Sequence, residues 1–260
     1  MMVAALAANS YNKVIGGVTV KDKIKCELLD LLFPPRCPVC REILVREDGM
    51  VHAKCMAKLK YVSEPVCLRC GKPIENAQEE YCYDCQKHRH YFDGGRAVWI
   101  YEQHMRQSIV WYKYKHCKEF SDFYSDQMIQ KLGSWMKSLH PDAVIPVPLN
   151  KKKLRIRGYN QAEPIALRLA QYIGCKMDVH TLVRSRYTAP QKDLGPAERF
   201  NNLKKAFTVD VKAAAGYRRI LLVDDIYTTG STMDACAHQL KEAGVGEIFF
   251  VTMCIGSERN

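Results

Sequence analysis

The stretch that decides the fold of this 260-residue chain runs Ile220-Leu-Leu-Val-Asp-Asp-Ile-Tyr-Thr-Thr-Gly-Ser-Thr232. Its apolar start predicts a short buried strand, with the adjacent carboxylates of Asp224 and Asp225 at its carboxyl end. A hydroxyl- and glycine-rich turn then opens a helix expected over 231–243. In an open α/β sheet, ligands bind outside the carboxyl ends of the strands, and the amino terminus of a helix can hold a phosphate there. A strand, two acids and a phosphate turn together predict a sugar-phosphate site.

This segment resembles the 5-phosphoribosyl-1-diphosphate (PRPP) binding motif of type I phosphoribosyltransferases at every position. The resemblance implies that Asp224 and Asp225 hold the ribose 2′- and 3′-hydroxyls. It also implies that the 5-phosphate is ringed by five residues of the turn, namely Thr228, Thr229, Gly230, Ser231 and Thr232. The alternative is a strand–turn–helix with a threonine-rich cap and two solvated acids, which leaves the pattern as a whole unexplained.

Composition places the chain among ordinary globular proteins of one or two domains, since 47% of its residues are apolar. No apolar run approaches the roughly 20 residues that a membrane span needs, and the start lacks the basic region of a signal peptide. We therefore expect a cytoplasmic protein. The net charge of +11 favours polyanionic partners, either nucleic acid or phosphorylated small molecules, although it also serves solubility. Twelve cysteines without an export signal point to reduced thiols or metal ligands.

Eight ligand-type residues in the first third of the chain form four evenly spaced pairs. The pairs are Cys37 with Cys40, His52 with Cys55, Cys67 with Cys70, and Cys82 with Cys85. Tetrahedral zinc takes four such ligands, so the pattern predicts two structural Zn²⁺ sites. Consecutive pairing is favoured, but spacing alone also permits a cross-braced arrangement. Disulfides or redox pairs are the alternatives, and the βαβ pattern that accompanies a redox C-x-x-C is missing.

From about residue 95 the sequence alternates short apolar strands with amphipathic helices. Strands are expected over 97–101, 143–147, 219–223 and 247–255, and a helix over 119–139. A further helix should begin at Asn160, with Glu163 completing a capping pair, and end at Gly174. This alternation predicts an α/β fold whose parallel sheet is covered on both faces.

Two long segments of this region are expected to act as loops around the ligand. The first, 146–161, carries five cations within seven residues, among them Arg155 and Arg157 as candidate catalytic residues facing a diphosphate. A solvated basic loop is the plain alternative. The second, 184–202, is long enough for a lid and would bring cations to the leaving pyrophosphate, with a short helix over 196–205. The cations it could deliver are Arg184, Arg186 and Lys192.

The order of these parts resembles the ComF/GntX family, from Leu28 to about Cys254. The resemblance is carried by Leu32-Phe-Pro-Pro-Arg-Cys-Pro-Val-Cys40, Pro146-Val-Pro-Leu149, Arg155-Ile-Arg-Gly-Tyr-Asn-Gln-Ala162, Thr188-Ala-Pro-Gln191 with Arg199 and Asn202, and the 220–232 motif. It implies an amino-terminal extension over 1–30, a double zinc ribbon over 31–90 and a Rossmann-like type I phosphoribosyltransferase domain over 91–260. His52 departs from the family, whose members usually have cysteine there, but it keeps a ligand type. The resemblance does not extend to residues 1–25.

Two functions follow from this resemblance and are weighed against a plain adaptor role. We favour an enzyme that transfers phosphoribosyl from PRPP, with Mg²⁺, to an unknown nitrogen acceptor and releases pyrophosphate. The alternative is a non-catalytic PRPP sensor that binds single-stranded DNA and works with DNA-uptake proteins of natural competence at the inner face of the membrane. The aromatic residues Trp111, Tyr112 and Tyr114 fit base stacking. They alternate with Lys113, Lys115 and Lys118, and an ordinary amphipathic segment explains the same stripe.

Overall fold

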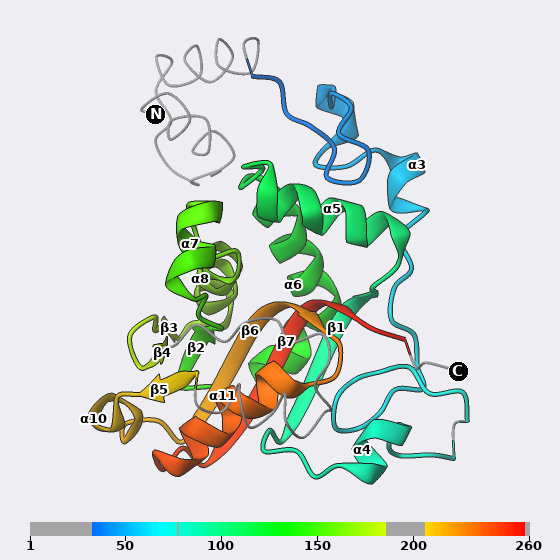
Figure 1. The fold of residues 1–260 in the computed structure, drawn as a ribbon. Helices are drawn as coiled ribbons and strands as arrows, with labels where there is room; N and C mark the ends of the chain where they lie inside the picture. The colour runs from blue at the N-terminus through cyan, green and yellow to red at the C-terminus, as the bar shows by residue number, and fades with distance from the viewer. Residues whose placement is uncertain (1–32, 77, 186–205, 258–260) are drawn as a thin grey trace.

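A five-stranded parallel sheet forms the centre of the molecule (Figure 1), in a computed structural model that describes residues 33–76, 78–185 and 206–257. The strand order is β1-β7-β6-β2-β3, and every neighbouring pair is parallel. The strands are β1 (Gly94–Ile100), β2 (Ala143–Pro146), β3 (Lys176–Met177), β6 (Arg219–Tyr227) and β7 (Glu247–Ile255). The predicted α/β class with a parallel sheet is confirmed.

Helices bury both faces of this sheet. They are α5 (Gln103–Tyr114), α6 (Phe120–Ser138) and α8 (Ala162–Ile173) on one face, and α11 (Ser231–Glu242) on the other. Successive side chains of a strand point to opposite faces. Leu221 and Val223 of β6 accordingly join the core beneath α6 and α8, whereas Ile220 and Leu222 join the core beneath α11. In the described part of the chain, no helix has the length and apolarity needed to cross a membrane.

Three elements that flank the candidate site, β2, β7 and α11, begin and end close to where the sequence places them. β2 ends one residue before the predicted 143–147, and β7 matches 247–255. Helix α11 occupies 231–242, and Gly244 follows with a φ of +95°. A residue in this left-handed region is a common way to end a helix, and glycine adopts it at no steric cost.

The expected basic loop at 146–161 is wrong in part, because its centre forms α7 (Lys151–Arg157). The Asn150 side chain caps this helix by accepting a hydrogen bond from the backbone N–H of Lys153 at 2.7 Å. Gly158, with a φ of +79°, ends it. Lysine, arginine and leucine are good helix formers, so the cations that suggested a loop instead belong to a capped helix.

The capping pair predicted for the next helix forms only in part. Helix α8 begins at Ala162 with Gln161 as the N-cap residue, and Oδ1 of Asn160 accepts a hydrogen bond from the N–H of Ala162 at 3.3 Å. The side-chain amide of Asn160 also donates to the carbonyl oxygen of Val147 at 3.1 Å, which ties the start of α8 to the end of β2. Asn160 and Glu163 still meet, but through backbone atoms only.

A small antiparallel sheet lies beside the main one and was not foreseen. It pairs β4 (Leu182–Arg184) with β5 (Phe207–Val209), and α10 (Val211–Ala214) follows. Most of the predicted lid at 184–202, including Arg186 and Lys192, and the helix expected over 196–205 lie outside the described residues.

Two compact lobes precede the sheet and contain the cysteine pairs. The first metal lobe, residues 37–55, contains the short helices η1 (Arg46–Asp48) and α3 (Ala53–Met56), and packs against α6. The second metal lobe runs between Cys67 and Cys85, and α4 (Tyr83–Lys87) closes it. A side-chain carbon at Gly71 would stand 2.6 Å from the carbonyl oxygen of Gly95, so this lobe touches the backbone of β1. Figure 1 shows the two lobes at different places along the sheet domain.

The segment between the lobes lies along the outer side of β1. The N–H of Val62 donates to the carbonyl oxygen of Val98 at 2.8 Å, and the N–H of Ile100 donates to that of Lys60 at 2.9 Å. Tyr61 forms an antiparallel bridge with Trp99 between these two bonds. The lobes and the sheet are thus joined through backbone hydrogen bonds as well as through side chains.

Candidate functional site

Both motif acids lie within the last part of β6, because this strand continues to Tyr227 instead of ending at residue 223 as predicted. Asp224 is paired with Thr252 of β7, and Tyr227 with Ile255. Adjacent strand residues point to opposite faces. Asp224 and Asp225 are both half-buried, and their side chains point to opposite faces of the sheet at its carboxyl edge.

Asp225 faces α5 and forms an ion pair there. The ammonium of Lys113 lies 2.7 Å from Oδ2 of Asp225, and the two side chains are only 15% and 14% exposed. Sequence reasoning placed Lys113 in an aromatic stripe and not at this site. The local pattern around Lys113 gave no signal for this pairing, because it depends on α5 packing over the end of β6.

Asp224 faces the opposite wall, beneath α11. Burial raises its pKa to about 7, and repulsion from Asp225 adds to the effect. The backbone N–H of Asp225, which donates to Oδ1 of Asp224 at 2.8 Å, and the charges of Lys113 and Lys153 act in the opposite direction. Arg184, at the end of β4, also interacts electrostatically with Asp224. At neutral pH the Asp224 carboxyl is therefore close to its midpoint of ionisation.

A group of cations surrounds the two acids. Lys153 of α7 is half-buried; burial lowers its pKa, and the positive charges of Arg184, Arg157 and Lys113 lower it further. Like charges held near one another are unfavourable in the absence of an anion. Several mutually repelling cations are therefore held close to the two acids at this sheet edge.

The turn between β6 and α11 combines a left-handed glycine with several hydroxyl groups. Gly230 adopts a φ of +78° immediately before α11, and the hydroxyl oxygens of Thr229 and Ser231 lie 2.9 Å apart. Thr228 and Thr229 are exposed, and Ser231 and Thr232 are half-buried. The first N–H groups of a twelve-residue helix and several hydroxyls are thus available to an anion.

The two candidate catalytic arginines differ in position. Arg155 is exposed on α7, whereas Arg157 is 6% exposed and makes contacts inside the fold. Its guanidinium donates to the side-chain oxygen of Gln161 at 2.8 Å and to the hydroxyl of Tyr114 at 3.0 Å. These contacts make Arg157 a residue that joins α5, α7 and α8.

The aromatic stripe belongs to α5, and most of it faces inward. Tyr112 is fully buried and donates its hydroxyl to the carbonyl oxygen of Gln161 at 2.8 Å. Trp111 is half-buried with the Arg41 guanidinium 5.5 Å from its ring centre. Tyr114 is 52% exposed, so only this ring of the three is widely accessible.

The first metal lobe brings Cys37, Cys40, His52 and Cys55 together, with their ligand atoms within 4.8 Å of one another. Nδ1 of His52 faces the sulfur of Cys40 at 3.4 Å. Its Nε2 lies 3.3 Å from the carbonyl oxygen of Ile43 and 3.4 Å from a carboxylate oxygen of Asp48. A histidine that ligates zinc through one nitrogen and contacts a carboxylate through the other is a common arrangement.

The second metal lobe groups Cys67, Cys70, Cys82 and Cys85 in the same way. The structure thus combines consecutive pairs, which was the favoured arrangement. Three thiolates with an imidazole, and four thiolates, both fit tetrahedral zinc. Lys72, only 4% exposed, pairs with Asp84 at 2.6 Å beside the second group.

His90 connects the second metal lobe to the start of α11. Its Nδ1 lies 2.5 Å from a carboxylate oxygen of Asp234, in the first turn of α11. The N–H of Tyr91 donates to the other oxygen of Asp234 at 3.0 Å. The chain that leaves the lobe therefore holds the helix whose start would bind a phosphate.

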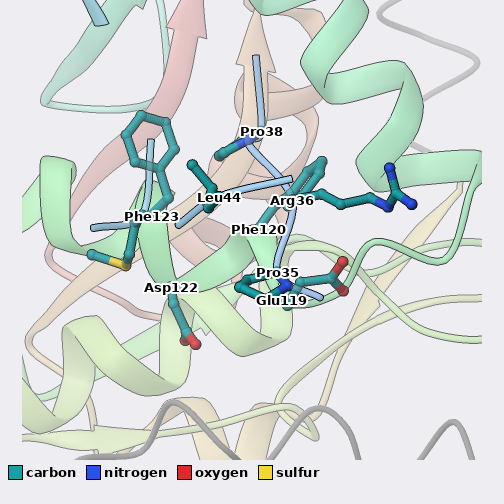
Figure 2. Close-up of a pocket in the computed structure, with 9 residues that line it drawn as sticks. Pro35, Arg36, Pro38, Leu44, Glu119, Phe120, Asp122 and Phe123 are labelled. Atoms are coloured by element: carbon teal, nitrogen blue, oxygen red, sulfur yellow. The ribbon is translucent and has the colours of Figure 1, made fainter. Parts of the chain in front are cut away.

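Figure 2 shows a crevice elsewhere, between the first metal lobe and the start of α6. It encloses about 30 Å³, room for only a few water molecules. It is lined by Pro35, Arg36, Pro38, Leu44, Met50, Glu119, Phe120, Asp122 and Phe123. This crevice is too small for a sugar phosphate.

The chain is similar to several bacterial proteins over most of its length. Competence protein F of Haemophilus influenzae is 30% identical over 226 residues, which are 83% of this chain and 95% of that protein. Competence protein ComFC of Bacillus subtilis is 26% identical over 90% of this chain and 94% of its own. DNA utilization protein YhgH of Escherichia coli K12 is 25% identical over 86% and 98%. Residues 28–86 match the double zinc ribbon domain family.

Solved structures similar to this chain include phosphoribosyltransferases. The purine phosphoribosyltransferase of Pyrococcus horikoshii covers 52% of this chain and 90% of its own, at 16% identity and a TM-score of 0.30. The orotate phosphoribosyltransferase of Aeropyrum pernix covers 56% and 63%, at 16% identity and a TM-score of 0.32. TM-scores this low do not establish structural similarity. The fold class is therefore assigned from the order and direction of the strands.

The structure combines a parallel-sheet α/β domain with a double zinc ribbon that precedes it. The chain belongs to the ComF family of competence proteins.

Proposed function

We propose that this protein binds PRPP at the carboxyl end of β6 and transfers its phosphoribosyl group to a nitrogen acceptor. The observation that carries the proposal is the meeting of two half-buried carboxylates, Asp224 and Asp225, with a glycine turn and a cluster of cations at one sheet edge. Carboxylates accept hydrogen bonds from sugar hydroxyls, the turn suits a 5-phosphate, and the cations suit a diphosphate.

Each group would have a distinct role. Asp224 and Asp225 accept hydrogen bonds from the ribose hydroxyls, and residues 228–232 surround the 5-phosphate. Lys153 and Arg184 stabilise the diphosphate, with Arg155 able to join them from its exposed position on α7. Arg157 acts by positioning, because Tyr114 and Gln161 hold its guanidinium inside the fold.

In the transfer, the bond between C1 of the ribose and the diphosphate oxygen breaks, and its electron pair leaves with pyrophosphate. The nitrogen lone pair forms the new bond to C1, and the proton of the nitrogen passes to water. Cations that neutralise the departing diphosphate would supply most of the acceleration, together with alignment of the acceptor. Mg²⁺ favours carboxylate and phosphate oxygens. Because Asp225 is already paired with Lys113, Mg²⁺ fits here as a partner of the ligand phosphates.

The test is calorimetric titration of the zinc-loaded protein with PRPP and Mg²⁺. The wild type should bind, and Asp224→Ala/Asp225→Ala should not, whereas Glu242→Ala at the exposed far end of α11 should bind like the wild type. Release of pyrophosphate in the presence of nitrogen acceptors then tests transfer. A wild type that binds no PRPP would contradict the proposal.

A second candidate is a non-catalytic, PRPP-sensing factor that binds single-stranded DNA at the inner face of the membrane together with DNA-uptake proteins. The exposed cations of α7, including Lys151 and Arg155, support it, as does the exposed ring of Tyr114, which Arg157 of the same helix contacts. The names of the relatives, which refer to competence and DNA utilization, point the same way.

The two candidates differ in their response to salt. Phosphate contacts make the affinity for DNA fall as salt rises. Fluorescence anisotropy with a labelled single-stranded oligonucleotide should show this slope, and Lys151→Ser/Arg155→Ser should reduce it. An affinity that is absent or independent of salt would leave only the PRPP proposal.

A further inference from the structure

Lys113 supplies a built-in positive charge to the acidic strand end. It comes from α5, which carries none of the motif residues, yet its ammonium lies 2.7 Å from Asp225. Both side chains are largely enclosed, at 15% and 14% exposure. An ion pair on an open surface contributes little to stability and is easily exchanged for contacts with water. This pair is largely shielded from solvent, and its carboxylate belongs to Asp225, which the proposed function assigns to the sugar.

The backbone around Lys113 is fixed by contacts on both sides of it. Tyr112 donates to the carbonyl oxygen of Gln161, and its own carbonyl oxygen accepts from the hydroxyl of Tyr159 at 2.6 Å. The hydroxyl of Tyr114 accepts from Arg157. The end of α5 therefore holds Lys113 over the carboxyl edge of the sheet, and only the flexible side chain of Lys113 is free to follow a ligand.

This pairing changes the charge that a ligand encounters. Two unpaired carboxylates beside a diphosphate would repel it and would call for a divalent cation between them. Here one carboxylate already has a cation at hydrogen-bond distance. A lysine with three donors can keep its contact with Asp225 and donate to a ligand oxygen at the same time.

We propose that Lys113 is the charge-compensating residue of the sugar-binding carboxylates and takes the place of a divalent cation at Asp225. This inference rests on the proposed function, because it assumes a diphosphate sugar at this edge. If Lys113 has this role, the protein should bind PRPP without added Mg²⁺. This ability should depend on Lys113, which lies outside the binding motif.

The experiment compares PRPP titrations in magnesium-free and magnesium-containing buffers, without a chelator so that zinc is retained. Lys113→Met should lose about ten- to a hundredfold in affinity without Mg²⁺, the effect expected when a hydrogen bond to a charged group is removed. Added Mg²⁺ should restore most of that loss. Lys113→Arg should stay close to the wild type in both buffers. Lys212→Met, which removes an exposed lysine of α10, is the charge control.

Each result separates the two proposals. A wild type that binds PRPP only with Mg²⁺, or a Lys113→Met protein weakened equally in both buffers or not at all, would overturn the role of Lys113 and leave PRPP binding intact. A wild type that binds PRPP in neither buffer would overturn the proposed function itself. Thermal melting of each variant shows whether the fold is kept. A merely structural lysine would change the melting temperature but not the magnesium dependence.

Discussion

The hydroxyl of Tyr227 lies where a side chain at Gly230 would begin. A Cβ at Gly230 would stand 2.5 Å from that oxygen, while the Tyr227 ring stacks on Phe250 with 4.8 Å between ring centres. Tyr227, the last residue of β6, thus packs directly against the turn at 228–232. The turn can approach Tyr227 this closely only because Gly230 has no side chain.

Gly230→Ala should therefore damage the turn. Its φ of +78° would cost a residue with a side chain about 1–3 kcal/mol, and the clash with Tyr227 would add to this. Gly244→Ala is the matched control, because Gly244 has a φ of +95° and a Cβ there would meet none of the described atoms within 4 Å. We expect both variants to lower the urea midpoint and only Gly230→Ala to weaken PRPP binding. Equal affinities would contradict the proposed role of the turn.

The half-buried carboxyl of Asp224, whose pKa is raised, should make stability depend on pH. Its pKa of about 7 in the folded protein exceeds the unfolded value of about 3.9. The folded state then binds more protons than the unfolded state between these values, so this group lowers the free energy of unfolding as pH rises from about 4 to 7. Asp224→Asn removes this contribution and should gain stability relative to the wild type at pH 8 but not at pH 4. Parallel urea midpoints across this range would refute the pKa shift.

The first metal lobe should tolerate a change of ligand but not its loss. His52→Cys is expected to keep two zinc ions per chain, because a thiolate replaces the imidazole, whereas His52→Ala should keep one. Asp48→Asn should weaken zinc binding at this lobe about tenfold or more, as loss of a carboxylate behind a ligating histidine commonly does. Zinc content after dialysis and competition with a chromogenic chelator measure these effects. A His52→Ala protein that retains two zinc ions would exclude His52 as a ligand.

The two metal lobes should support different parts of the sheet domain. The second lobe shares a buried cluster with Tyr227 and Phe250, and the first shares one with Phe120 and Phe123. Since structural zinc contributes directly to folding, Cys82→Ser should raise hydrogen exchange at 227–235, and Cys55→Ser at 119–125. Each variant is the control for the other. The same exchange pattern in both would show that the lobes act on the sheet without distinction.

Sequence reasoning succeeded where a local pattern decides the structure. The start of the motif strand, the turn and α11 could be predicted, because apolar spacing and the glycines at 230 and 244 determine the conformation of neighbouring residues only. It failed at α7, where five cations suggested a loop although Asn150 and Gly158 cap a helix. The expected capping pair at Asn160 is only partly formed, because the Asn160 side chain bonds both to the N–H of Ala162 and to Val147 at the end of β2.

The contacts that build the site were beyond the reach of sequence patterns. Lys113 meets Asp225, and His90 meets Asp234, across long stretches of chain. No period or motif marks such pairs, because the packing of whole helices on the sheet brings them together. Of the two arginines predicted to face the ligand, Arg157 joins three helices, because its position on α7 turns it inward, and Arg155 is exposed.

The backbone bonds that Lys60 and Val62 make with β1 have a consequence for the behaviour of the isolated parts. β1 is the outermost strand on its side of the sheet, and such a strand exposes N–H and carbonyl groups that can pair with another molecule. The segment between the metal lobes occupies these groups on Val98 and Ile100. This segment thus shields the sheet from edge-to-edge aggregation. A fragment that begins at β1 would lack it and would be exposed to self-association, even with every motif residue in place.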